Sequence, residues 1–179
     1  MRNFRDTRAR WLCVSTVALA LLPVCHAQAG TPKSTNEVLL ARWNEIGNKL
    51  VQMAQEFPED KYSFQPVDGV RSFAAVLRHV AFWNQYVVKK ARGESPDGNA
   101  NELSPAEYPN KAAIVTALKK SVEDGAAILK APGAGRTARE LDLWTSLTGH
   151  ADEHYGQLVV YYRLNKLVPP ATRAENGGS

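Results

Sequence analysis

Residues 39–57 read LLARWNEIGNKLVQMAQEF, and the apolar positions in this stretch decide the fold. They recur four, three, four, three and four residues apart, at Leu39, Trp43, Ile46, Leu50, Met53 and Phe57. This spacing follows the turn of an α-helix, so it predicts an amphipathic helix with one side against a core. Pro58 comes directly afterwards and ends the helical pattern.

Three further segments show the same periodicity, and we find no sustained two-residue alternation typical of strands. These segments are residues 71–92, 110–130 and 137–165. Asn110 is the predicted N-cap of the third helix, and Thr137 with Glu140 forms a predicted capping box for the fourth. Residues 94–109 are rich in turn-forming residues, which predicts a long loop. The predicted fold class is therefore all-α, a four-helix bundle.

The N-terminus predicts an export signal. Its first ten residues include four arginines, residues 11–25 form an almost unbroken apolar run, and the small-residue cleavage pattern Ala27-Gln28-Ala29 follows. We therefore expect a cleaved signal peptide at 1–29, a bundle domain at 30–170 and a flexible tail at 171–179. The expected location is outside the cytoplasm, either periplasmic or secreted.

Two other interpretations of the N-terminus stay open. The first is a retained membrane anchor, although a spanning helix needs ~20 apolar residues and this run is shorter. The second is a lipoprotein signal with Cys25 as the lipidated residue, although Pro23-Val24 is a poor match to the small residues that normally precede such a cysteine.

Cleavage after Ala29 changes the chemistry available to the mature chain. Both cysteines, Cys13 and Cys25, leave with the signal, which excludes a disulfide, a cysteine nucleophile and a covalently attached haem. The signal carries four arginines and one aspartate, so its removal lowers the net charge from +4 to +1. The basic composition is thus no argument for nucleic-acid binding, and we expect no stable membrane insertion after cleavage.

The three histidines of the mature chain predict a metal site. His150 and His154 lie four residues apart on one face of the fourth helix, where they can bind one ion together. His79, on the second helix, is the predicted third ligand because bundle sites form between facing helices. Three imidazoles suit zinc, nickel, cobalt or ferrous iron and leave a coordination position for water or substrate.

Glu153 is the weak candidate for a catalytic base. The stretch His150-Ala-Asp-Glu153-His154 matches the H-x-x-E-H pattern of inverted zinc peptidases, in which the glutamate acts on water. Those enzymes also need a downstream acidic ligand, and Glu175 in the tail is the only acid after His154. The competing interpretation makes Glu153 part of a solvated helix face.

The chain resembles the DinB-like (DinB/YfiT-like) family of metalloenzymes. Residues 154–165, HYGQLVVYYRLN, followed by Val168-Pro-Pro, are similar to the closing motif of that family, and residues 70–81 are similar to its second-helix motif. The resemblance covers residues 34–170. It implies an up-down-down-up bundle and a divalent metal, often nickel or zinc, on His79, His150 and His154.

The resemblance also bears on partners and chemistry. Many members of the family associate as homodimers, and some are thiol-dependent transferases or isomerases. The export signal would remove this chain from the cytoplasmic thiol pool. Two function classes therefore stay open: a metal-dependent hydrolase or transferase acting on a small molecule, and a non-catalytic bundle that binds a metal or another ligand. An open coordination site beside a cleft favours the enzyme, and a closed one favours the binding protein.

Overall fold

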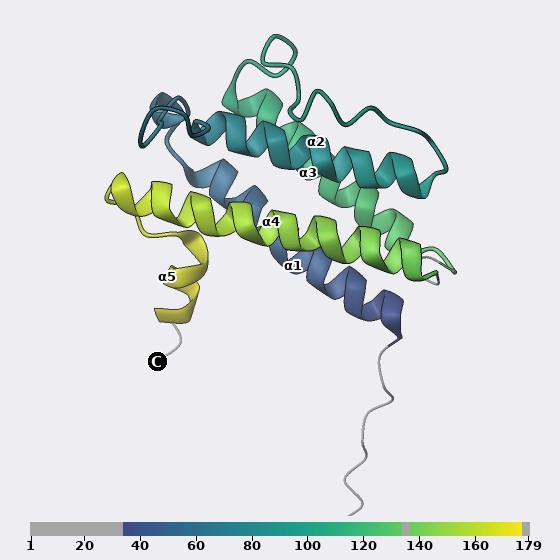
Figure 1. Cartoon of the computed structure of the whole chain (residues 1–179). Helices are drawn as coiled ribbons and strands as arrows, with labels where there is room; N and C mark the ends of the chain where they lie inside the picture. The colour runs from purple at the N-terminus through teal and green to yellow at the C-terminus, as the bar shows by residue number, and fades with distance from the viewer. Residues whose placement is uncertain (1–33, 134–136, 177–179) are drawn as a thin grey trace, which may run out of the picture. The chain divides into compact units, whose positions relative to one another are not determined.

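The computed structural model describes residues 34–133 and 137–176, and every regular element in these ranges is helical (Figure 1). The elements are α1 (Thr35–Glu56), the 3-10 helix η1 (Glu59–Lys61), α2 (Phe73–Ala91), α3 (Lys111–Lys130), α4 (Ala138–Leu164) and α5 (Pro170–Asn176). The predicted all-α fold is confirmed. The predicted signal peptide at 1–29 lies outside the described residues.

The four long helices form a bundle with up-down-down-up directions. In Figure 1, α1 and α4 run one way and α2 and α3 run the other. Residues 92–110 make this arrangement possible, because they return along α2 and start α3 at the opposite end of the bundle. Helix α1 packs on α3 and α4, and α2 also packs on α3 and α4. The interface between α2 and α4 is the one that carries the histidines.

Side-chain caps fix where the helices begin. Asn110 caps α3 by accepting the backbone N–H of Ala113 at 3.0 Å, as predicted. Thr137 and Glu140 form the predicted capping box of α4. Ser34 forms a further capping box at the start of α1, and Ser72 caps α2 by accepting the backbone N–H of Ala75. These caps satisfy amide donors that a helix start otherwise leaves unpaired.

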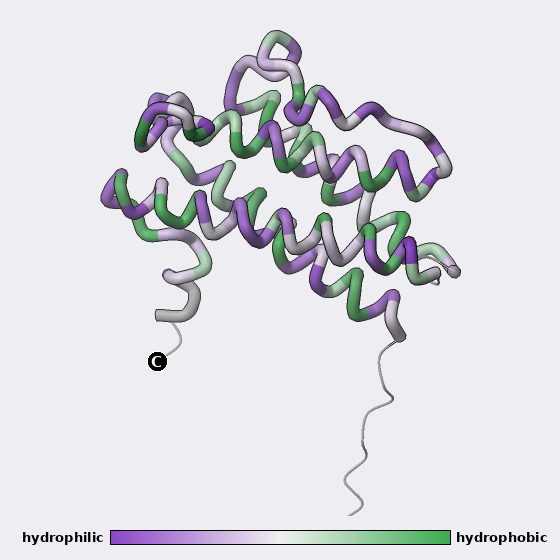
Figure 2. Tube along the Cα trace, in the orientation of Figure 1, coloured by the Kyte–Doolittle hydropathy of each residue, from purple (hydrophilic) through white to green (hydrophobic). Residues whose placement is uncertain are grey.

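The core fills the space between the helices in two clusters, and Figure 2 shows apolar positions recurring along all four long helices. All six apolar positions predicted for the first helix are buried. One cluster centres on Phe57, which stacks on Phe73 with ring centroids 3.7 Å apart. The other centres on Trp43 and Trp144, whose rings meet edge to face at 5.2 Å.

Gly125 on α3 lets α1 approach closely. The indole of Trp43 lies against it, 2 % exposed, and donates its Nε1–H to the carbonyl of Val122 at 2.9 Å. A Cβ built on Gly125 would lie within 2.7 Å of three indole atoms, closer than real Cβ atoms come. Glycine in a helix interior costs ~1 kcal/mol relative to alanine. In exchange for this cost, glycine at position 125 allows the close contact between α3 and the indole of Trp43.

The C-terminal segment differs from the expected flexible tail over part of its length. Residues 170–176 form the short helix α5, which packs against α1. Arg173 of α5 forms an ion pair with Glu56 of α1. Pro170 is the first residue of α5, a position that suits proline because the missing N–H would be unpaired there in any case.

A separate observation concerns membranes. Within residues 34–133 and 137–176, no helix combines the length and the apolar character that crossing a bilayer requires.

Candidate metal centre

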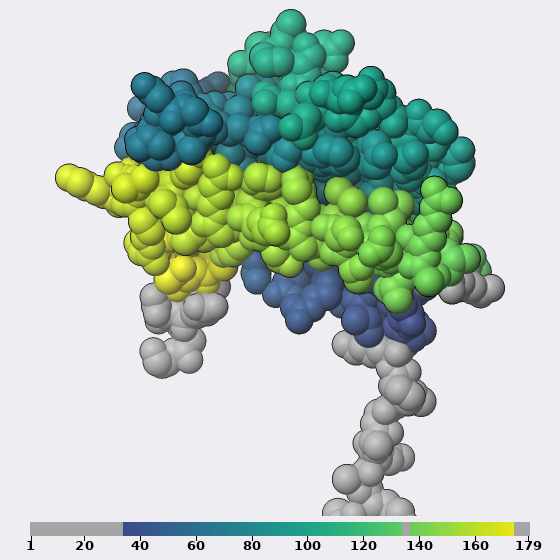
Figure 3. All heavy atoms as spheres, in the orientation of Figure 1, coloured from purple at the N-terminus to yellow at the C-terminus, as the bar shows by residue number. Residues whose placement is uncertain are grey.

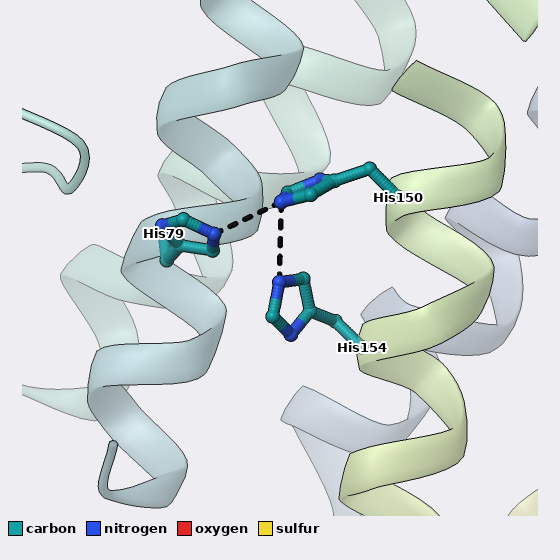
Figure 4. Close-up of side chains that lie close together, drawn as sticks. All are labelled: His79, His150 and His154. Atoms are coloured by element: carbon teal, nitrogen blue, oxygen red, sulfur yellow. Dashed lines mark hydrogen bonds between the residues drawn. The ribbon is translucent and has the colours of Figure 1, made fainter. Parts of the chain in front are cut away.

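The three predicted ligands meet in the middle of the α2–α4 interface. Figure 4 shows His79 on α2 facing His150 and His154 on α4. The Nε2 atom of His150 lies 2.9 Å from Nε2 of His79 and 3.1 Å from Nε2 of His154. One nitrogen from each ring lies within 4.8 Å of the other two. The three imidazoles therefore could hold one metal ion.

A loop residue orients His79. Its Nδ1 donates to the backbone carbonyl of Asn101, in the long connection between α2 and α3. Asn101 has a φ of +56°, and its side-chain oxygen accepts the indole N–H of Trp83 at 2.9 Å. Because a carbonyl only accepts, Nδ1 of His79 must carry the proton. The lone pair of neutral His79 is therefore on Nε2, which points at the other two histidines.

A chain of three hydrogen bonds fixes the tautomer of His154. The hydroxyl of Tyr161 donates to the carbonyl of Arg71 at 2.6 Å, so its oxygen accepts from Nε2 of Gln157 at 2.9 Å. The amide oxygen of Gln157 is then left to accept the Nδ1 proton of His154 at 2.9 Å. Neutral His154 thus also carries its lone pair on Nε2, toward the centre of the cluster.

These residues fit a divalent ion. His79 and His154 both turn lone pairs toward Nε2 of His150, and one N–H on His150 can satisfy only one of them. A shared cation satisfies all three nitrogens at once. Imidazole nitrogens about 2.0–2.1 Å from one ion lie about 3 Å or slightly more from each other, close to the observed separations. Hydrogen bonding of the remote Nδ1 is the usual support for a metal-binding histidine.

Burial lowers the pKa of His79 and His150 and so favours their neutral form, which is the form that binds metal. It lowers the pKa of His150 to about 4, with His154, His79 and Arg71 acting in the same direction. Burial also lowers the pKa of His79, although the hydrogen bond to Asn101 opposes the shift. His79 is 5 % exposed, so water has little access to its ring.

We predict that the metal-free protein loses stability as the pH falls from about 6.5 toward 4. In this window an unfolded histidine takes up a proton that folded His150 does not accept, so protonation favours the unfolded state. The loss should be about 2 kcal/mol for this half-buried group. Urea unfolding of chelator-treated protein across this range measures it. In His150→Gln the additional loss should disappear, and equal pH profiles for the two proteins would contradict the prediction.

We also predict that Gln157 controls metal affinity without binding the ion. Replacing Gln157 with leucine removes the acceptor for Nδ1 of His154 and should weaken metal binding about 10–100-fold. Gln157→Glu keeps an acceptor and should stay close to wild type. Competition with a coloured chelator gives the affinities. A leucine variant that binds as tightly as wild type would show that the hydrogen bond has no role in metal binding.

The structure places the remaining candidate, Glu153, on the exposed side of α4. It forms no hydrogen bond or ion pair within the described residues, so its position agrees with a solvated helix face. The spacing of His150 and His154, with His79 on a second helix of the predicted bundle, identified the three rings but not the residues that orient them. Gln157 follows His154 by three residues and Tyr161 follows Gln157 by four, and this helical spacing is a signal that could have found both. Asn101 acts through its backbone and leaves no side-chain signal.

Comparison with known families finds a match. The model of one family, described as the DinB superfamily, matches residues 42–158. The match covers more than half of the chain and includes all three histidines. No curated protein matches the chain.

Proposed function

The chain belongs to the DinB superfamily, and we propose on that premise that it binds one divalent metal ion through His79, His150 and His154 and uses it to transform a small molecule. The observation that carries this proposal is the convergence of the three rings: Nε2 of His150 lies about 3 Å from Nε2 of both His79 and His154, and one nitrogen from each ring lies within 4.8 Å of the others. The remote nitrogens of two of these rings are tied to Asn101 and Gln157.

The proposed chemistry is metal-dependent hydrolysis or group transfer. A bound divalent ion supplies Lewis-acid activation of an oxygen or sulfur atom of its ligand. The chain contributes the rest: Asn101 and Gln157 accept hydrogen bonds from Nδ1 of His79 and His154. His150 and His154 are only half-buried, so the cluster is partly open to solvent. Figure 3 shows α2 and α4 side by side on the face that it views. The donor set accepts zinc, nickel, cobalt or iron, and the family resemblance favours zinc or nickel among them.

We propose that the protein works outside the cytoplasm. The arginine-rich start, the short apolar run and the Ala27-Gln28-Ala29 site support this location. An exported enzyme would act on a substrate other than a cytoplasmic thiol. The mass of the mature protein isolated from the producing cell tests this part, because cleavage after Ala29 gives a chain that begins at Gly30.

The second candidate is a non-catalytic bundle that binds metal or another ligand. One observation favours it: within residues 34–133 and 137–173, no carboxylate side chain forms a hydrogen bond with any of the three histidines. Glu102 is close to the site, but it pairs with Arg78 at 2.8 Å. General-base catalysis needs an acceptor within reach of the proton that it removes. An enzyme built this way would depend on the ion and on groups of the substrate.

Metal analysis of protein purified without a histidine tag tests the proposal. We expect about one divalent ion per chain, and then turnover in a screen of ester, amide and group-transfer substrates that stops on chelation and in His150→Ala. Activity that survives both changes would overturn the metal-centred mechanism. Stoichiometric metal with no turnover on any substrate would favour the binding protein.

A further inference from the structure

Arg71 lies beside the histidine cluster, and its positive charge is only partly compensated by a neighbouring carboxylate. Its backbone carbonyl accepts from Tyr161, at the end of the hydrogen-bond chain that holds His154. Its side chain is 36 % exposed and lines a surface hollow together with Gly69, Val70 and Gln157. The guanidinium is close enough to lower the pKa of both His79 and His150. It therefore sits where a molecule that approaches His154 from this side would meet it.

The partner of Arg71 is shared with a better-placed arginine. Glu102 pairs with Arg78 at 2.8 Å, and the Arg78 side chain is only 11 % exposed. The Nε atom of Arg71 lies 3.9 Å from the other oxygen of Glu102, beyond hydrogen-bond distance. Within the described residues the Arg71 side chain forms no hydrogen bond. Its planar set of N–H donors is free to bind an oxyanion in the bidentate manner that arginine favours.

The charge around the cluster points to an anionic ligand. Two arginines, Arg71 and Arg78, face one glutamate here, and imidazole side chains carry no negative charge that could balance the second arginine. A bound divalent ion would make the site still more positive. Electrostatic complementarity then selects negatively charged molecules.

We propose that Arg71 anchors the carboxylate or phosphate group of a small anionic ligand that binds beside His79, His150 and His154. The inference rests on the proposed metal-binding function and adds a ligand class to it. It gives Arg71 the role of a binding residue, with the oxyanion held between its guanidinium and the cluster. The competing role, a surface ion pair with Glu102, contributes little at such exposure and distance.

Anion binding to the cobalt-loaded protein tests the proposal without any knowledge of the reaction. Cobalt content is measured first, and the visible spectrum is then titrated with acetate, inorganic phosphate and imidazole. In Arg71→Met we expect acetate and phosphate to bind about tenfold more weakly or worse, since hydrogen bonds to charged groups have effects of this order. Arg71→Lys keeps the positive charge but loses the planar set of N–H donors that binds an oxyanion in a bidentate manner. Its affinities for acetate and phosphate should therefore lie between those of wild type and Arg71→Met.

Two controls separate the possible causes. Arg163→Met removes an exposed arginine of α4 that has no ion pair in the described part of the chain, and it should bind both anions as wild type does. Imidazole is neutral, so its affinity should not change in Arg71→Met. The ratio of acetate to phosphate affinity distinguishes a carboxylate ligand from a phosphate ligand.

The outcomes identify which idea is wrong. Equal anion affinities in wild type and Arg71→Met, with cobalt bound to both, would overturn the role of Arg71 and leave the metal site standing. Failure of the wild-type protein to bind cobalt would overturn the metal site and this inference with it. A selective loss of anion binding in Arg71→Met would support the assignment of an anionic ligand.

Discussion

Replacing His154 with alanine should weaken divalent-metal binding by more than about 100-fold. Loss of a hydrogen-bond partner of a metal-binding histidine already costs about 10–100-fold, and this change removes the ligand itself. The effect should be large because His79 and His150 would be left as a pair, and Nε2 of His154 lies only 3.1 Å from that of His150. Equilibrium dialysis against zinc or nickel, with metal quantified by mass spectrometry, gives the loss directly.

Glu153→Gln is the matched control for this variant. It alters the residue beside His154 on the exposed side of the same helix, and metal binding should not change. Circular dichroism of the metal-free proteins shows whether His154→Ala still folds. The combined variant His79→Ala, His150→Ala and His154→Ala gives the decisive result, because one ion per chain retained by that protein would refute the site.

The substitution Gly125→Ala should lower the free energy of unfolding by about 2 kcal/mol, although alanine is the better helix former. The new methyl group would lie within 2.7 Å of the indole of Trp43, which is buried and hydrogen-bonded to Val122. Overpacking of this kind typically costs about 1–3 kcal/mol or more, which outweighs the ~1 kcal/mol gained in helix propensity. Urea unfolding followed by circular dichroism measures the difference.

Gly156→Ala should change the free energy of unfolding in the opposite direction and serves as the matched control. Gly156 is exposed on α4 and nothing lies within 4 Å of a Cβ built there, so this change should raise stability by up to ~1 kcal/mol. The smaller ring in Trp43→Phe should make Gly125→Ala less harmful, which a double-mutant cycle would detect as coupling. Equal effects of alanine at positions 125 and 156 would contradict the packing role of Gly125.

Much of this structure could be predicted from the spacing of apolar residues and histidines along the sequence. The regular spacing from Leu39 to Phe57 predicts a helix face, and all of its apolar positions are buried. The i, i+4 spacing of His150 and His154 places both rings on one face of a single helix. A bundle then brings His79 opposite to them, because α2 and α4 are packed together.

The parts that could not be predicted depend on contacts between distant segments. The carbonyl of Asn101 reaches His79 only because the long connection returns along α2, and a backbone atom has no signature in sequence. The close approach of Trp43 to Gly125 needs the packing of α1 on α3. Arg71 gains its position through Tyr161, which lies 90 residues away.

The C-terminal helix α5 could not be predicted from the sequence for a different reason. Pro169 and Pro170 predict the end of the fourth helix, and α4 does end before them. The same proline that prevents the continuation of one helix is also well suited to begin another. Helix α5 starts at Pro170 and is held by its packing on α1, and composition alone does not predict that packing.

The connectivity of the bundle affects how it folds, because its helix interfaces join segments that are distant in sequence. In the described part of the chain, the extensive contacts between long helices are of this kind: α1 packs on α3 and α4, and α2 reaches α3 only through residues 92–110. Long segments must therefore close before any interface forms, which slows the folding of a helical protein. His79 and His150 are 71 residues apart, so the ion-binding cluster exists only once the last long helix has docked. Binding of the ion should thus slow unfolding rather than accelerate folding.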